Sequence, residues 1–378
     1  MEASYLINRP DNEIVKNATT DILKRSDALK FHTGLPEYRP TPLFRLPDLA
    51  LKYNVGDIYI KDESHRFGLN AFKGLGAVYA ISELLKENPN LETFCTATDG
   101  NHGRAVAWGA TRFEKRSVVF VPGDTTLQRM KCIEKEGARV EKVQGNYDDA
   151  CAVAEKACKE NGWELVQDMA WEGYEKIPAD IMAGYLSLFR EMEDSIHTLP
   201  DSRADVVFMQ AGVGSFAGAG AFYYLNRYGA RRPRIVTVEP LEADGIFASF
   251  TSGQLTTSTG NATTIMAGLN CGTPSLGAWD ILKNGVDVAL KIPDHYARRA
   301  VRELFFPDGC DRRIISGESG AGGLAGFLAV MSEKNLEPVR KVLNITKSSN
   351  VLFISTEGDT DKTVFNEIIT TGESTEKK

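Results

Sequence analysis

Short apolar runs alternate with longer segments of helical hydrophobic spacing through most of this chain, and that alternation limits the folds it can adopt. The expected strands are Asp57–Lys61, Thr93–Ala97, Ser117–Val121, Arg139–Val143, Glu164–Gln167, Asp205–Gln210, Arg234–Glu239 and Val351–Ser355. The expected helices are Ala71–Leu85, Arg104–Phe113, Thr125–Glu136, Tyr147–Glu160, Pro178–Met192 and Ala217–Arg227. Such an alternation predicts parallel β-sheets with helices on both faces, and therefore an α/β fold.

The composition is that of an ordinary globular protein. The 378 residues are 42% hydrophobic and 25% charged, and the formal net charge is −7. A chain of this length supports about two to three domains of about 100–200 residues each. Because the chain has no basic block and a negative net charge, we do not expect nucleic acid as a partner.

Cysteine usage and hydropathy indicate a cytoplasmic protein. The six cysteines are scattered without a C-x-x-C pair, which is typical of free thiols in a reducing compartment. The first residues lack the basic and apolar regions of a signal peptide, and no apolar run approaches the roughly 20 residues of a membrane span. We therefore expect no contact with a membrane.

The segment Asp62–Gly74 places a lysine between an expected strand and an expected helix. Gly68 marks the turn, and Asn70 is a natural N-cap for the helix Ala71–Leu85. Lys73 would then lie in the first helical turn, where the helix dipole disfavours a cation and should lower the pKa of the amine. Such a lysine is suited to forming an imine with a carbonyl compound. A solvated lysine on an ordinary helix would fit the same pattern.

A second candidate segment, Thr96–Gly103, follows an expected strand. Ligands of open α/β sheets collect beyond the carboxyl ends of the strands, which is where this loop should lie. The loop offers the carboxylate of Asp99, the amide of Asn101, and glycines that let backbone N–H groups approach a ligand. An ordinary turn between a strand and a helix explains the segment equally well.

A third candidate segment, Gln210–Ala217, opens a helix after an apolar strand. Gly212 and Gly214 would expose backbone amides at the helix N-terminus, which is a favourable site for an anion. The spacing also satisfies the dinucleotide fingerprint G-x-G-x-x-G/A, and Glu239 ends the next strand near the expected separation. An NAD-dependent dehydrogenase is therefore an alternative.

Further polar residues follow other strands. Ser355 and Thr356 end the last apolar strand, where a hydroxyl could bond a heterocyclic nitrogen or cap the next helix. Asp168 also follows a strand and could face a site. The histidines show no metal-ligand spacing and no Gly-x-Ser-x-Gly motif is present, so we predict neither a metal site nor a serine hydrolase.

Together these segments resemble the fold-type II pyridoxal-phosphate enzymes, which include tryptophan synthase β-subunit, cysteine synthase and threonine dehydratase. Within this group the chain resembles the diaminopropionate ammonia-lyases. The resemblance extends from about Tyr38 to about Phe365 and is carried by Lys61–Lys73, Thr96–Gly103, Gln167–Tyr174 and Ile354–Asp361. Asp99 is its specific signal, because relatives often carry Ser-Ser-Gly-Asn where this chain has Thr-Asp-Gly-Asn. The phosphate loop from Gly212 to Phe216 departs from the glycine-richer run of the group.

The resemblance implies pyridoxal 5′-phosphate as the cofactor. Lys73 would hold it covalently, Asn101 would bond its 3′-oxygen, and Ser355 or Thr356 would bond its ring nitrogen. The backbone amides of five consecutive residues would bind its phosphate, namely Gly212, Val213, Gly214, Ser215 and Phe216. The implied fold has two open, twisted, mostly parallel sheets flanked by helices, with the cofactor in the interdomain cleft. Residues 1–78 and 172–378 would form the large cofactor-binding domain, and residues 79–171 the small domain.

The implied reaction is α,β-elimination of 2,3-diaminopropionate, in its D and L forms, to pyruvate and ammonia, with serine as a poorer substrate. Lys73 and Asp99 would act as bases on opposite faces, and Asp168 would hold the leaving β-ammonium group. A pyridoxal-phosphate-dependent serine or threonine dehydratase, or a β-replacement enzyme, is the nearest alternative, and the dehydrogenase is a more distant one. A homodimer is implied as well, because dimers are usual in this fold group.

Overall fold

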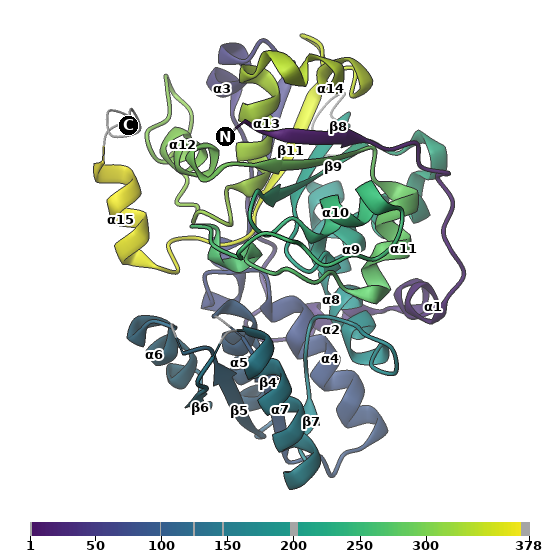
Figure 1. Cartoon of the computed structure of the whole chain (residues 1–378), viewed down its shortest axis with the longest axis vertical. Coiled ribbons are helices and arrows are strands. Elements are labelled where there is room, and N and C mark those ends of the chain that lie inside the picture. The colour runs from purple at the N-terminus through teal and green to yellow at the C-terminus, as the bar shows by residue number, and fades with distance from the viewer. Residues whose placement is uncertain (1, 99, 124, 146, 197–202, 372–378) are drawn as a thin grey trace. The chain divides into compact units, whose positions relative to one another are not determined.

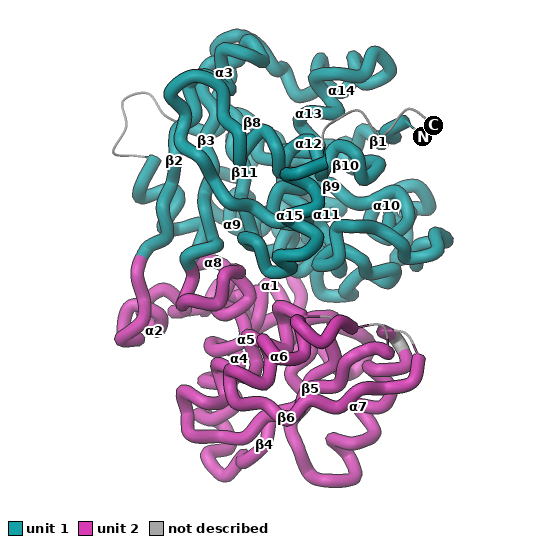
Figure 2. Tube along the Cα trace, turned by 90° about the vertical axis from the view of Figure 1, so that its left-hand side faces the viewer, with its two compact units in different colours: residues 1–15, 40–65, 188–378 teal, residues 16–39, 66–187 magenta. Residues whose placement is uncertain are grey.

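The computed structural model describes residues 2–98, 100–123, 125–145, 147–196 and 203–371, which form an α/β fold (Figure 1). Internal contacts divide the chain into two compact units (Figure 2). Unit 1 comprises Met1–Val15, Pro40–His65 and Leu188–Lys378, and unit 2 comprises Lys16–Arg39 and Arg66–Ser187. The predicted small domain, residues 79–171, lies within unit 2, and its limits stay a prediction.

Unit 1 is built on a seven-stranded sheet of order β1-β10-β9-β8-β11-β3-β2. The strands are β1 (Ser4–Ile7), β2 (Leu43–Arg45), β3 (Asp57–Asp62), β8 (Val206–Gln210), β9 (Arg234–Pro240), β10 (Val288–Ile292) and β11 (Asn350–Ser355). The inner strands pair in parallel, whereas β1 and β2 are antiparallel edge strands. Strands β8 and β11 are apolar and buried along nearly their whole length, as expected for parallel strands covered on both faces.

Helices cover the sheet of unit 1 and close its core. They are α3 (Pro47–Lys52), α9 (Ser215–Tyr228), α10 (Gly245–Ser252), α11 (Leu276–Gly285), α12 (Asp294–Phe305), α13 (Gly322–Ser332), α14 (Glu337–Val342) and α15 (Lys362–Thr370). Helix α13 is buried from Gly322 to Val330 because it packs directly on the sheet. Glycine permits this approach, since a Cβ atom at Gly326 would lie 2.4 Å from Cγ2 of Val238 on β9.

Unit 2 is built on a four-stranded parallel sheet of order β6-β5-β4-β7. Its strands are β4 (Thr93–Ala97), β5 (Arg116–Val121), β6 (Arg139–Lys142) and β7 (Glu164–Leu165). Its helices are α1 (Ala18–Arg25), α2 (Ala28–Thr33), α4 (Gly74–Glu87), α5 (Asn101–Arg112), α6 (Leu127–Lys135) and α7 (Tyr147–Asn161), and α8 (Lys176–Ile196) begins in this unit.

The side chains of β5 show how this smaller sheet is covered on both faces. Val118 and Phe120 pack in one cluster with Ala150 and Ala154 of α7. The alternate residue Val119 packs in a second cluster with residues of α5 and α6. Because successive residues of a strand point to opposite faces, one short apolar strand serves both layers.

The predicted fold class is confirmed, since both sheets are mostly parallel and flanked by helices. Strands β1, β2 and β10 were not predicted. The edge strands β1 and β2 have three or four residues with no fully buried position, so their local pattern is weak. Strand β7 ends at Leu165, two residues before its predicted end. Within the described ranges, none of the helices combines the length and apolar character needed to cross a membrane.

Candidate active site

Lys73 lies immediately before helix α4. The backbone that leads to it passes through three left-handed residues, Phe67 (φ 50°), Gly68 (φ 72°) and Asn70 (φ 57°), so the helix begins only after this turn is complete. Lys73 is the N-cap residue, and its carbonyl oxygen accepts a hydrogen bond from the N–H of Ala77 at 3.2 Å. The prediction that Asn70 is the N-cap and that Lys73 lies in the first turn is therefore wrong, because the left-handed turn delays the helix.

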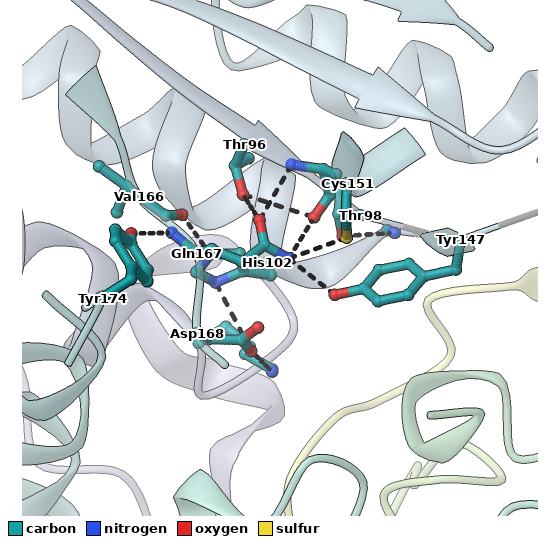
Figure 3. Close-up of polar contacts among 12 residues, drawn as sticks. Thr96, Thr98, His102, Tyr147, Cys151, Val166, Gln167, Asp168 and Tyr174 are labelled. Atoms are coloured by element: carbon teal, nitrogen blue, oxygen red, sulfur yellow. Dashed lines mark hydrogen bonds and ion pairs between the residues drawn. The ribbon is translucent and has the colours of Figure 1, made fainter. Parts of the chain in front are cut away.

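Lys73 pairs with a carboxylate that lies 95 residues further along the chain. Its Nζ donates to Oδ2 of Asp168, whose side chain is 6% exposed. Nδ1 of His102 lies 3.8 Å from the same oxygen (Figure 3). Nε2 of His102 is 2.8 Å from the carbonyl oxygen of Val166, which can only accept, so we assign the proton of the neutral ring to Nε2. His102 therefore turns its unprotonated Nδ1 towards the carboxylate.

Charge and burial set the protonation of this group. Burial raises the pKa of Asp168, but the charges of His102 and Lys73 and the hydrogen bond from Lys73 lower it to well below its ordinary value. Burial lowers the pKa of His102, an effect that Asp168 opposes and Lys73 reinforces. The carboxylate of Asp168 is therefore ionised at neutral pH, in direct contact with the amine of Lys73.

The loop after β4 supplies Asn101, the first residue of α5, which is half-buried. The hydroxyl of Thr98 accepts a hydrogen bond from the N–H of Gly100 at 2.9 Å, which stabilises the turn into the helix. A Cβ atom at Gly103, in the first turn of α5, would lie 2.3 Å from Cγ2 of Thr98, so glycine lets the helix pack closely against the loop. Asp99, the other candidate in this loop, lies outside the described residues.

In unit 1 the predicted phosphate loop connects β8 to α9. Gly214 is the N-cap of α9 and has a left-handed backbone (φ 92°), and a Cβ atom there would lie 2.9 Å from Cδ1 of Ile246. A Cβ atom at Gly212 would lie 3.3 Å from the carbonyl oxygen of Gly268. The two glycines thus let this loop pack closely against Ile246 and Gly268, and the loop ends at the N-terminus of α9, whose dipole favours an anion. This cradle fits the phosphate of the predicted cofactor.

Glu239 was the residue that favoured a dinucleotide. Its side chain is fully buried, and its two carboxylate oxygens accept hydrogen bonds from the N–H groups of Ile246 (2.8 Å) and Phe247 (2.7 Å) at the start of α10. Burial raises the pKa of this carboxyl group, although the two backbone bonds oppose the shift. Glu239 therefore stabilises a helix start and does not present a carboxylate to a ribose.

The two hydroxyls at the end of β11 have different partners. Ser355 is fully buried, and its hydroxyl donates to the hydroxyl of Ser316 at 2.8 Å. The hydroxyl of Thr356 accepts from Nε2 of Gln210 at 2.8 Å. The same Nε2 also bonds the carbonyl oxygens of Gly320 and Ile354, each at 2.9 Å. The two hydrogens of this amide are thus shared among three acceptors, of which the hydroxyl of Thr356 is one.

Three polar residues that lie near the candidate residues were not themselves predicted as site residues: His102, Gln167 and Gln210. Each bonds the backbone at or just beyond a strand end. A sequence signal for the two glutamines exists. Each follows an apolar run that predicts a strand, and neither the strand nor a turn requires an amide side chain there.

Comparison with protein families assigns the class that this arrangement defines. The family model of the pyridoxal-phosphate-dependent enzymes matches residues 35–346. The chain is therefore a pyridoxal-phosphate-dependent enzyme, which confirms the predicted cofactor. An amine at a helix entrance and a glycine cradle at the N-terminus of α9 are consistent with that cofactor.

More similar relatives narrow the assignment. The diaminopropionate ammonia-lyase of Escherichia coli (strain K12) is 39% identical over 389 residues, which cover 98% of each chain. A crystal structure of the E. coli enzyme in complex with an aminoacrylate–PLP azomethine reaction intermediate matches with a TM-score of 0.91 and 38% identity over 98% of both chains. A complex of the same enzyme with D-serine also has a TM-score of 0.91, at 37% identity. The chain belongs to the diaminopropionate ammonia-lyase family, as its motifs predicted.

Proposed function

We propose that this enzyme catalyses the α,β-elimination of 2,3-diaminopropionate to pyruvate and ammonia, accepts both enantiomers, and acts on serine more slowly. The observation that carries the proposal is the buried, ionised carboxylate of Asp168 in direct contact with the Lys73 amine. A carboxylate beside the reacting amine provides a partner for a cationic β-substituent, and a hydroxyl group does not need such a charge. The similarity to diaminopropionate ammonia-lyases supports the same substrate.

The cofactor would be held by residues at the ends of strands and the starts of helices. Lys73 would link it covalently, Asn101 would bond its 3′-oxygen, and the amides of Gly212, Val213, Gly214, Ser215 and Phe216 would bind its phosphate. Of the two candidate hydroxyls we favour Thr356 over Ser355 for the ring nitrogen, because Ser355 already donates its hydroxyl hydrogen to Ser316. When bound, pyridoxal phosphate supplies a conjugated ring that stabilises negative charge at the substrate Cα.

The residues of the chain then divide the work of binding and proton transfer. The amine of Lys73 would remove the α-proton of the L-substrate, and Asp99 would remove that of the D-substrate. The carboxylate of Asp168 would hold the β-ammonium group and orient it for departure. Nδ1 of His102 lies 3.8 Å from Oδ2 of Asp168, so the protonation of His102 would respond to the charge of that carboxylate.

A serine dehydratase is the alternative that a specific observation favours, because a solved relative binds D-serine. Its leaving group is neutral, so it would gain little from the charge of Asp168. A β-replacement activity would require a second substrate. Among the described residues we identify no feature that would bind one. Relative rates on diaminopropionate and serine separate these possibilities.

We also propose a homodimer in the cytoplasm. The support for the dimer is membership of a fold group in which dimers are usual. The described cysteines are free thiols, which is typical of a reducing compartment. Sedimentation of the purified protein at several concentrations would test the dimer.

The proposed reaction is tested by measuring ammonia and pyruvate released from D- and L-2,3-diaminopropionate and from D- and L-serine. We expect equal amounts of pyruvate on a molar basis, two ammonia molecules per diaminopropionate, and slower turnover of serine. Borohydride reduction should attach the cofactor to the peptide that contains Lys73, and Lys73→Ala should prevent this attachment. Preferred turnover of serine would contradict the proposal.

A further inference from the structure

The ladder between β4 and β7 is unusually short, and a side chain continues it. The two strands pair at Phe94 with Glu164 and at Cys95 with Leu165, and the N–H of Val166 bonds the carbonyl oxygen of Cys95 at 2.8 Å. If this register continued, the N–H of Ala97 would bond the carbonyl oxygen of Val166, and the carbonyl oxygen of Ala97 would accept from the N–H of Asp168. Instead, the side-chain amide of Gln167 takes that place. Its Oε1 accepts the N–H of Ala97 at 3.1 Å, and its Nε2 donates to the carbonyl oxygen of Ala97 at 3.0 Å.

The remaining bonding positions of this amide are also occupied. Oε1 accepts the hydroxyl hydrogen of Thr96 at 2.8 Å, and Nε2 donates to the hydroxyl of Tyr147 on α7 at 2.7 Å (Figure 3). The backbone N–H of Gln167 donates to the hydroxyl of Tyr174 at 2.8 Å. Gln167 is only 1% exposed, so an apolar replacement would leave the buried N–H and carbonyl of Ala97 without these partners.

This substitution of a side chain for the main chain has a geometric consequence. Because the amide of Gln167 satisfies Ala97, the backbone can leave the sheet at Val166, whose carbonyl oxygen instead accepts from His102. Beyond Gln167 the chain places the carboxylate of Asp168 in contact with the amine of Lys73. On the other side of the same amide, Ala97 is the last residue of β4, and the loop to Asn101 begins directly after it.

We propose that Gln167 is a positioning residue for the elimination reaction. Its amide joins the end of β4 to the segment that carries Asp168, and so maintains the spacing between Asn101 and that carboxylate. The inference rests on the proposed function for its effect on turnover. The structural part, in which Gln167 holds two strand ends together, is independent of the substrate.

The test compares three variants by hydrogen exchange and kinetics. Gln167→Met nearly keeps the shape of the side chain and removes every hydrogen bond of its amide. Thr96→Val removes the bonds of the Thr96 hydroxyl to Oε1 of Gln167 and to the carbonyl oxygen of Ala97, and leaves the Gln167 amide itself in place. Ile133→Val is the control, because Ile133 of α6 is fully buried in the same unit, where it packs in one cluster with Val119. Exchange is measured by mass spectrometry on peptides 94–103 and 164–175, in the holoenzyme and in cofactor-free protein.

We expect Gln167→Met to exchange faster in these two peptides alone and to lose on the order of tenfold to a hundredfold in kcat, with unchanged cofactor absorbance. Thr96→Val should lower kcat by about twofold to tenfold. Ile133→Val should change neither quantity. Wild-type kcat in Gln167→Met, or faster exchange throughout unit 2, would overturn the proposal.

Two further outcomes are distinguishable. If Gln167→Met does not fold, Thr96→Val decides, and wild-type exchange and kcat in that variant would overturn the proposal. If the wild-type protein releases no ammonia from diaminopropionate, the proposed function fails. The exchange of the two peptides in cofactor-free Gln167→Met then still decides whether Gln167 joins the strand ends.

Discussion

Asp168→Asn removes the negative charge beside Lys73 while nearly keeping the shape of the side chain, so it tests whether this carboxylate selects a β-amino substrate. The Asp168 side chain is 6% exposed, so solvent screens its charge little. A charge-assisted hydrogen bond to a β-ammonium group contributes about 1.5–3 kcal/mol, which corresponds to about tenfold to a hundredfold in kcat/KM. The neutral hydroxyl of D-serine can still bond the asparagine amide, so its loss should not exceed that of an ordinary hydrogen bond, about 0.5–1.5 kcal/mol or about twofold to tenfold.

The assay is the initial rate of pyruvate release from L-2,3-diaminopropionate and D-serine by the wild-type protein and the variant. Asp180→Asn is the matched control, because Asp180 is also a buried aspartate of unit 2 and pairs with Lys176 at 2.9 Å. We expect that control to affect both substrates equally. Equal losses for both substrates in Asp168→Asn would refute the reasoning and assign Asp168 to the support of the fold or the cofactor.

Three further predictions concern the other base, the glycine cradle and acid stability. Asp99→Asn should abolish most turnover of D-2,3-diaminopropionate, by about 10²–10⁴-fold, and spare the L-enantiomer; a common loss in both enantiomers would exclude a separate base for the D-form. Gly214→Val should weaken cofactor binding in an absorbance titration, because φ is 92° and the new Cβ would meet Ile246, whereas Gly229→Val, also at a positive φ but in open space, should retain it. The pKa of Asp168 is held below its unfolded value of about 3.9, so the ionised group stabilises the folded chain above that pH, and this contribution is lost as the pH falls through the folded pKa. The difference in free energy of unfolding between the wild type and Asp168→Asn, measured by urea denaturation, should therefore be largest near neutral pH and shrink below about pH 4; a difference that persists in acid would contradict this.

The sequence alone determined the fold class and the segments that carry the chemistry. Parallel strands buried on both faces, such as β8, must be apolar along their length, and the helices between them must carry an apolar face, so both are visible in a local window. Gly212 and Gly214 were visible for a similar reason, because a backbone that approaches a ligand at a helix start requires residues without a Cβ atom. The motif residues Lys73 and Asp99 then identified the family.

Only the tertiary structure decided which polar groups meet. Lys73 and Asp168 are 95 residues apart, and Gln210 and Thr356 are 146 apart, so no local pattern records either contact. Glu239 matched a nucleotide-binding spacing, yet folding places it on the backbone amides of α10. The helix start at Lys73 was also misjudged, because the left-handed turn before it depends on packing as well as on capping preference. Local propensity depends on neighbours along the chain, whereas a buried hydrogen bond depends on strands and helices that meet only when the chain has folded.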